Sequence, residues 1–115
     1  MTPPFPSRGE VWMADFNPTR GHEQAGKRPA LIVSVDEFNQ GPAGLVIVLP
    51  VTSKQKHIAS HVPVVPSEGG LRQPSFIKCE DVRSIAAERL SARLGVVSEA
   101  AMSAVEDRLR ILLDL

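Results

Sequence analysis

The segment from Asn17 to Pro29, with the sequence N-P-T-R-G-H-E-Q-A-G-K-R-P, concentrates side chains that could do chemistry. Its charged residues lie between two glycines and two prolines, directly before the apolar run 30–35. A segment of this composition cannot bury its own side chains, so strands on either side must hold its ends. Loops held in this way by a rigid scaffold often carry binding and catalytic groups. We therefore predict that the functional site includes this loop.

Arg28 and Glu23 are the loop's candidates for electrostatic or acid–base chemistry. Pro29 biases the backbone of Arg28 towards an extended conformation, so the guanidinium would leave the chain where the next strand begins. There it could donate a planar pair of N–H groups to a phosphate, or simply make a salt bridge at the rim of the fold. Glu23 could serve as a general base or as the partner that orients Arg28. Composition does not choose between these roles.

A second polar turn begins at Thr52 and Ser53, which follow an apolar strand and Pro50. Their hydroxyl groups should emerge at the rim of the fold. They could hydrogen-bond a phosphoryl oxygen or cap the turn, and residues of this type commonly cap turns.

Histidine and cysteine offer weaker alternatives. His57 and His61 have the spacing of a helical pair, but Pro63 argues against a helix there, and Cys79 is too distant and apolar in its setting to be a third ligand. We predict no metal site and no cofactor. Two-histidine hydrolysis of RNA stays open because imidazole titrates near neutral pH, whereas Cys79 has no nearby histidine to activate it. Trp12 is expected in the core or an interface.

Composition bounds the function classes. The chain has 115 residues, 43% hydrophobic and 23% charged, with zero net charge, which argues against a general nucleic-acid coat protein. Between residues 38 and 79, however, Glu68 is the only acid among four lysines and arginines, so this part could meet a few phosphates. A single cysteine excludes an internal disulfide, and we find neither a signal peptide nor a long apolar segment. We expect a cytoplasmic protein.

Apolar runs separated by Gly/Pro turns predict a mainly β domain over residues 8–115, preceded by a flexible arm at residues 1–7. Pro50 is expected to end its strand or to mark a bulge, and Pro63 to place its strand at an edge. The strands are expected at Val11–Phe16, Ala30–Val35, Leu45–Val51, His61–Val65, Ser75–Cys79, Val82–Ile85 and Leu94–Val97.

After Ser98 the apolar period becomes helical. Met102, Val105, Leu109 and Leu112 form one stripe of an amphipathic helix, with Ser98 as its N-cap. Short strands, turns and one terminal helix indicate a small, strongly curved β-barrel with the helix packed on it. Small barrels bind ligands through the loops at one rim.

Three stretches together resemble the MazF/PemK family of toxin–antitoxin endoribonucleases: Arg8–Trp12, Phe16–Ala30 with its Glu-Gln-Ala-Gly-x-Arg-Pro signature, and Leu49–Ser53. The resemblance covers nearly all of the chain after residue 7. It implies an SH3-like barrel (α+β, mainly β), a homodimer, and metal-independent cleavage of single-stranded RNA, commonly mRNA. It also implies a cognate antitoxin whose acidic, disordered tail blocks the RNA groove, and no membrane partner.

The resemblance assigns the catalytic roles to Arg28 and Thr52, with Glu23 as the acid that orients Arg28 or accepts a proton. Some relatives have an Arg-x-Asp arrangement where this chain has Lys78 and Glu80, so charge is kept but reach and geometry differ. A CcdB-like module that poisons a protein target is the alternative. The residues expected to contact RNA are Arg20, Gln24, Lys27, Ser53, Lys54, Lys56, Lys78 and Glu80.

Overall fold

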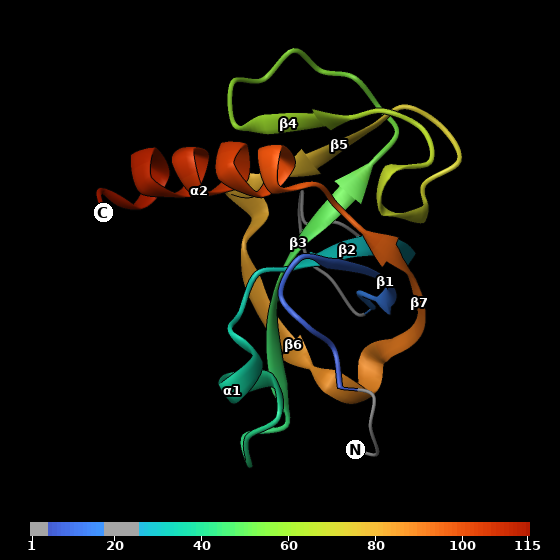
Figure 1. Ribbon diagram of the computed structural model, residues 1–115, viewed down its shortest axis with the longest axis vertical. Helices are drawn as coiled ribbons and strands as arrows, with labels where there is room; N and C mark the ends of the chain where they lie inside the picture. The colour runs from blue at the N-terminus through green and yellow to red at the C-terminus, as the bar shows by residue number, and fades with distance from the viewer. Residues whose placement is uncertain (1–4, 18–25) are drawn as a thin grey trace.

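The computed structural model describes residues 5–17 and 26–115, whose strands form one curved antiparallel sheet with a helix across one end (Figure 1). The sheet order is β4-β5-β3-β2-β1-β7, and β6 pairs with β3 beside that path. This confirms the mainly β fold with a C-terminal helix, although the path ends at β4 and β7 rather than closing on itself. The elements are β1 (Glu10–Asp15), β2 (Lys27–Ile32), α1 (Asp36–Asn39), β3 (Leu45–Thr52), β4 (His61–Val64), β5 (Ser75–Lys78), β6 (Arg83–Ala86), β7 (Leu90–Val96) and α2 (Glu99–Leu113).

Strand β3 organises the sheet because it pairs with three others. Along one side it faces β2, with Ala30 opposite Pro50. Along the other side residues 45–48 pair with β6, and residues 51–52 pair with β5. Of the two predictions for Pro50, the end of a strand is therefore wrong, because β3 continues to Thr52. Pro50 lies where β3 changes from one partner to the next, a position at which a missing N–H group is tolerated.

Successive side chains of the central strands point to opposite faces of the sheet, and they form two hydrophobic cores, one on each face. In β1, Val11 joins one cluster and Trp12 joins the other. In β2, Leu31 and Ile32 divide in the same way. These strands are buried on both faces, which is why their sequences are almost continuously apolar. Packing in both cores holds the central strands in place, and with them the polar residues at the strand ends.

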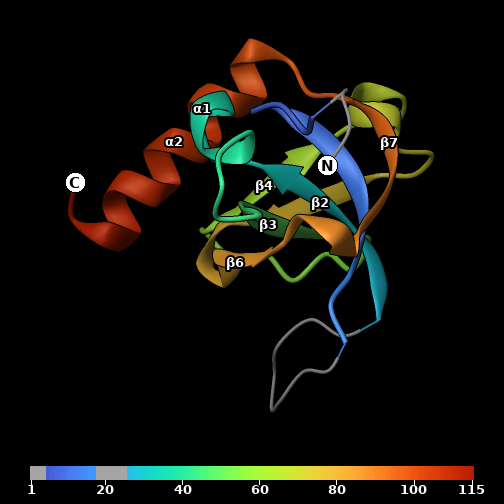
Figure 2. The same ribbon diagram turned by 90° about the horizontal axis from the view of Figure 1, so that it is seen from below.

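Helix α2 covers the first core. The Ser98 hydroxyl accepts a hydrogen bond from the Ala101 N–H at 3.1 Å, which confirms the predicted N-cap. Val105 is fully buried, and Met102 and Leu109 pack beside it. The far end of the helix projects beyond the sheet (Figures 1 and 2). Exposed apolar side chains gather there: Ile111, Leu112, Leu113 and Leu115.

Three elements differ from the sequence prediction. Strand β2 spans Lys27–Ile32 where Ala30–Val35 was expected, so Arg28 lies inside the strand and not in the loop before it. Strand β7 begins at Leu90, four residues before the predicted start. Its first residues are mostly exposed and lack an apolar pattern, so the sequence did not indicate them as part of a strand. The single turn α1 was not predicted. Its Asn39 is buried and donates to the carbonyl oxygens of Pro6 and Ser34 at 3.0 and 3.1 Å. Of the expected arm, residues 1–4 lie outside the described residues, whereas Pro6 is buried.

The 3-10 turn η1 (Glu68–Gly70) is fastened to β7 and to the start of α2. Gly70 has φ +73°, and a Cβ there would lie 2.0 Å from the carbonyl oxygen of Leu94. Glu68 Oε1 accepts a hydrogen bond from the Ser98 N–H at 2.7 Å. These contacts hold the loop that follows η1, residues 71–73, against the sheet, where it forms one wall of the groove described below.

Within the described part of the chain, no helix is both long and apolar enough to cross a membrane.

Candidate functional site

An open groove of about 1020 Å³ brings together the ends of β2 and β3, the edge strand β4 with its neighbour β5, and the loop that follows η1. It contains Arg28 and Thr52, two of the three residues that the sequence analysis assigned to catalysis. Most of the predicted RNA contacts that the structure describes also line it: Ser53, Lys54, Lys56, Lys78 and Glu80. The other lining residues are Met13, Pro29, Val51, Ile58, His61, Gly70, Leu71, Arg72, Gln73, Ser75, Asp81 and Leu94.

Strand register explains why Arg28 and Thr52 share this groove. The last pair that joins β2 to β3 is Ala30 opposite Pro50. Extending each strand by two residues brings Arg28 and Thr52 to the same register position on the same face, since side chains alternate along a strand. At that point β2 is paired with β1 through Arg28 and Ala14, and β3 with β5 through Thr52 and Phe76. The two strands thus part around the groove.

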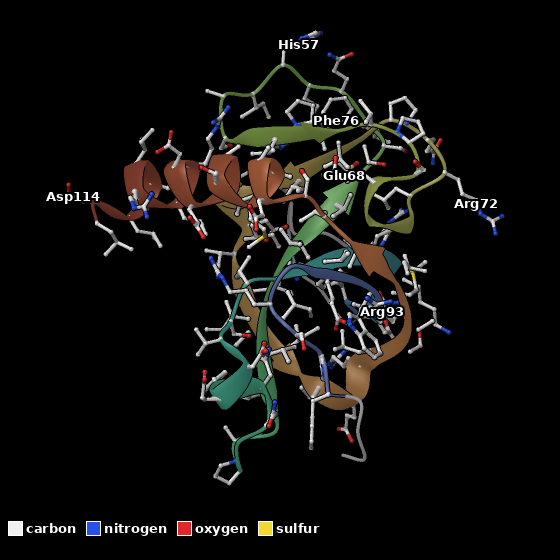
Figure 3. All side chains as sticks on the ribbon, viewed as in Figure 1. His57, Glu68, Arg72, Phe76, Arg93 and Asp114 are labelled. Carbon is white, nitrogen blue, oxygen red and sulfur yellow. The ribbon has the colours of Figure 1, made fainter. Side chains whose placement is uncertain are left out.

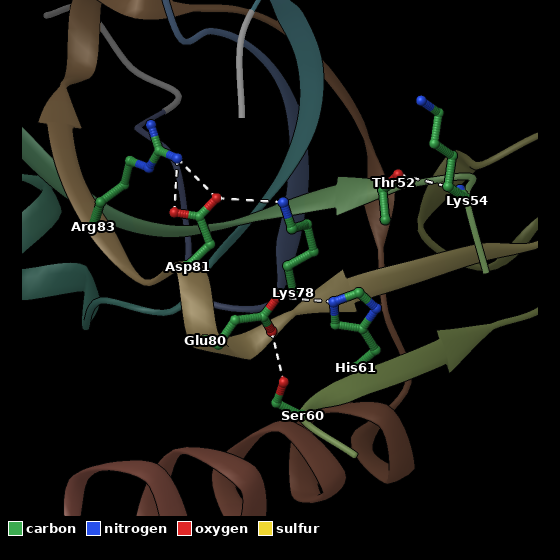
Figure 4. Close-up of polar contacts among 8 residues, drawn as sticks. All are labelled: Thr52, Lys54, Ser60, His61, Lys78, Glu80, Asp81 and Arg83. Atoms are coloured by element: carbon green, nitrogen blue, oxygen red, sulfur yellow. Dashed lines mark hydrogen bonds and ion pairs between the residues drawn. The ribbon is translucent and has the colours of Figure 1, made fainter. Parts of the chain in front are cut away.

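Thr52 has the turn-capping contact expected from its position. Its Oγ1 accepts a hydrogen bond from the Lys54 N–H at 3.1 Å (Figure 4). A hydroxyl that accepts one bond still has a hydrogen to donate. The cap fixes the oxygen in place, and the hydrogen can be given to a ligand in the groove.

The groove is predominantly basic. Its lysines and arginines are Arg28, Lys54, Lys56, Arg72 and Lys78, against the acids Glu80 and Asp81. Arg72 was not predicted as a site residue, and in Figure 3 it extends outward from the loop after η1. Lys27 is exposed at the first position of β2 and does not line the groove.

Three predicted residues, Arg20, Glu23 and Gln24, lie outside the described residues, and their roles stay predictions. The residues at the two ends of their loop, Phe16 and Asn17 on one side and Gly26 on the other, are described. The Phe16 N–H donates to the carbonyl of Gly26 at 3.0 Å, and the Gly26 N–H donates to Asn17 Oδ1 at 3.1 Å. Arg89 donates to the carbonyl oxygens of Asp15 and Asn17. An arginine far along the chain therefore secures the loop's stem, which no local sequence signal indicates.

Glu80 is held on both of its oxygens (Figure 4). The Ser60 hydroxyl donates to Oε1 at 2.7 Å, and His61 Nε2 lies 2.8 Å from Oε2. Burial by itself would raise the pKa of Glu80. Hydrogen bonds from Ser60, its own backbone N–H and His61 outweigh that effect and lower the pKa. Glu80 is thus an ionised, oriented carboxylate in a basic groove.

Asp81, beside it, is neutralised by cations. Arg83 Nη2 donates to both Asp81 oxygens, at 2.7 and 2.8 Å, and Lys78 Nζ lies 3.6 Å from Oδ2 (Figure 4). The Arg83 guanidinium also stacks over Phe16, 4.9 Å from the ring centroid. Asp81, which lines the groove, is therefore connected through Arg83 to Phe16, the residue just before the polar loop.

The alternative sites receive no support from this geometry. His61 is buried, whereas His57 is exposed at the outer tip of the loop between β3 and β4 (Figure 3) and does not line the groove. Among residues 5–17 and 26–115, no three His, Cys, Asp or Glu side chains come together as metal ligands. Cys79 is buried, and burial together with the nearby Glu80 raises the pKa of its thiol to about 11, an effect that Arg108 partly offsets. A protonated, inaccessible thiol is a poor nucleophile.

Comparison with known proteins gives a consistent result. Residues 7–113 match the family described as PemK-like, MazF-like toxin of type II toxin–antitoxin system. The chain is 37% identical over 113 residues to Endoribonuclease MazF9 of Mycobacterium tuberculosis, covering 94% of this chain and 96% of that protein. The crystal structure of MazF from Deinococcus radiodurans matches with a TM-score of 0.85 at 30% identity, over 96% of this chain and 98% of that one. A MazE–MazF structure from the same organism gives 0.78 at 30% identity, over 96% and 97%.

Proposed function

The chain belongs to the PemK-like, MazF-like toxins of type II toxin–antitoxin systems, and we propose that it is a metal-independent endoribonuclease that cuts single-stranded RNA at short sequences. The observation that carries the site assignment is that Arg28 and Thr52 line the same basic groove. Cleavage of mRNA in this way inhibits translation and growth.

The reaction needs a strong stabiliser of negative charge. A base removes the proton of a ribose 2′-hydroxyl, the 2′-oxygen bonds to phosphorus, and the bond from phosphorus to the 5′-oxygen breaks as that oxygen takes up a proton. A doubly charged phosphorane lies between these states. Arg28 donates to its oxygens, and Thr52 donates its remaining hydroxyl hydrogen. Contacts that strengthen as charge develops lower the barrier.

Arg28 acts as this stabiliser rather than as the base, because a guanidinium offers five N–H donors and no acceptor for a proton. Glu23 is our candidate to accept the 2′-hydroxyl proton or to orient Arg28. The basic residues of the groove, with Lys27, Arg20 and Gln24, hold the flanking phosphates and bases.

Two protein partners follow. MazF of Deinococcus radiodurans has been solved with MazE, and we propose that an antitoxin with an acidic, disordered tail covers the present groove, so that it competes with RNA for Lys54 and Lys56. We also propose a homodimer of SH3-like subunits in the cytoplasm. The exposed apolar end of α2 supports association.

The CcdB-like alternative, a module that poisons a protein target, is less favoured because the relatives of this chain are named as endoribonucleases. The deciding experiment is incubation of the purified protein with long single-stranded RNA in EDTA, followed by sequencing of the cut ends. Discrete cuts in chelator support the nuclease. Intact RNA across several diverse sequences, with folded protein, would favour the protein-target alternative.

A further inference from the structure

Glu80 is an unusual residue for a groove that binds a polyanion. Its side chain is 35% exposed and lines the groove, so its charge meets whatever enters. Asp81 is offset by Arg83 and Lys78, but the partners that the described residues give Glu80 are a hydroxyl and an imidazole. A carboxylate repels phosphate, so Glu80 disfavours the backbone of RNA at this point. What it favours is an N–H donor.

The surrounding residues keep Glu80 in one orientation. Ser60 and His61 adjoin each other at the start of β4, and each takes a different oxygen of the carboxylate. The His61 side chain is only 4% exposed. Within the described residues its second ring nitrogen, Nδ1, is buried without a hydrogen-bond partner. Glu80 is therefore the polar contact that accounts for the placement of this ring, and a ring nitrogen facing a carboxylate carries the hydrogen.

Glu80 retains capacity for a ligand. An ionised carboxylate offers about four acceptor positions. Ser60 and His61 account for two. The remaining capacity suits an N–H of a base edge, and single-stranded RNA is read by its protein partners through such unstacked edges.

We propose that Glu80 reads an exocyclic amino group of one base of the RNA, and that Ser60 and His61 are positioning residues that hold it there. Adenine, cytosine and guanine carry such a group. Uracil presents an N–H flanked by two carbonyl oxygens, which a carboxylate repels, so uracil is disfavoured at this position. The proposal rests on the proposed ribonuclease function and adds a base-specific contact to it.

The test is cleavage of an RNA pool with randomised sequence, with the ends sequenced. The wild type should disfavour uracil at one position of its motif by about tenfold, the lower range of discrimination by one well-placed base contact. Glu80→Gln should lose that discrimination and keep the rest of the motif, because an amide can also donate to the uracil carbonyls. Ser60→Ala and His61→Ala should weaken the discrimination, with a rise in KM larger than the fall in kcat.

His61→Gln is the informative rescue, because its amide nitrogen can take the place of Nε2 and restore the discrimination lost in His61→Ala. His57→Ala, an exposed histidine outside the groove, should keep the wild-type motif. Thermal unfolding of each variant checks the fold. If His61→Ala does not fold, Glu80→Gln and Ser60→Ala decide.

Some outcomes overturn the proposal while the nuclease function stands. They are a wild-type motif that tolerates uracil at every position, an unchanged motif in Glu80→Gln, or an equal loss at all sites in the variants. A wild type that cuts nothing instead refutes the proposed function. In that case binding of oligoadenylate, oligocytidylate and oligouridylate by wild type and Glu80→Gln tests the base contact alone, and equal binding of all three by the wild type overturns it.

Discussion

Gly70 and Leu94 meet backbone to backbone, so closely that a Cβ on Gly70 would lie 2.0 Å from the Leu94 carbonyl oxygen. Because the obstacle is backbone, no side-chain rotation can relieve the clash, and φ +73° adds strain for any other residue. We expect Gly70→Ala to lower the free energy of unfolding by roughly 3 kcal/mol or more.

Gly44→Ala is the matched control, since Gly44 also has positive φ but nothing lies within 4 Å of a Cβ there. It should cost only about 1 kcal/mol, from strain alone. Urea unfolding of both variants measures the difference. Equal losses would show that the contact with β7 contributes nothing.

Arg28→Ala should reduce kcat by about 100-fold or more, the usual effect of removing one stabiliser of transition-state charge. Arg28→Lys keeps the charge but loses the planar fork, and should recover only part of the rate. Single-turnover cleavage of one RNA oligonucleotide in EDTA measures both. Arg110→Ala, on the exposed face of α2, should match the wild type. Full activity in Arg28→Ala would move the chemistry to other residues.

Thr52→Val keeps the shape of the side chain and removes the hydroxyl, so cleavage should fall by roughly tenfold to 100-fold. Thr52→Ser keeps the hydroxyl and should remain active. The cap from Lys54 is lost in the valine variant, but at this exposed turn the cost in stability should be below about 1 kcal/mol. If Thr52→Val cleaves RNA like Thr52→Ser, Thr52 is a turn cap and nothing more.

Reversing the charge of two groove lysines should weaken the binding of both RNA and an acidic antitoxin tail. The double change Lys54→Glu, Lys56→Glu should weaken RNA binding and flatten the plot of log K against log salt by about 1.4, if each lysine meets one phosphate. Binding of polyglutamate, standing in for an acidic antitoxin tail, should weaken as well. Fluorescence anisotropy at several salt concentrations measures both affinities, with Arg110→Glu as control. Unchanged binding of both ligands would place the contacts elsewhere.

Glu10 should make the protein sensitive to acid. Its carboxylate accepts hydrogen bonds from Trp12 Nε1 at 3.0 Å, Arg93 Nε at 2.6 Å and the Ser7 N–H at 2.7 Å. Burial alone would raise its pKa, but these bonds outweigh burial and lower the pKa below its usual 4.5. The stabilisation is therefore present above the unfolded-state pKa and is lost as pH falls through the lower folded-state value.

Glu10→Gln should consequently be less stable than the wild type at pH 7, and the difference should shrink as pH falls below about 4.5. Urea unfolding between pH 7 and pH 3 measures this, with Glu37→Gln at an exposed position of α1 as control. A difference that stays constant with pH would contradict the assignment.

The sequence predicted the strands whose burial is decisive. The runs that became β2 and β3 are apolar because both faces are covered, and Ser98 is an N-cap in the structure as predicted. The start of β7 was missed because residues 91–93 are exposed and owe their strand conformation to pairing with β1. The expectation that Pro50 ends its strand was wrong, because a proline is tolerated inside β3 where the strand changes partners, which is a property of the sheet.

The residues of the site likewise divide into those that the sequence predicted and those that only the structure reveals. Residue type and motif indicated Arg28 and Thr52, but only the folded sheet brings both residues to one groove. The hold of Ser60 and His61 on Glu80, and that of Arg89 on the loop neck, depend on contacts between residues far apart in sequence. No local pattern encodes such contacts.

The groove draws its lining from Met13 near one end of the chain to Leu94 near the other, and β1 must pair with β7 to hold that wall. Contacts of such long sequence separation form only after the later segment is available. During synthesis the ribosome still holds that segment when the first strands emerge, so the nascent chain has no finished groove. A toxin built in this way has no complete RNA groove until the segment that carries Leu94 has left the ribosome.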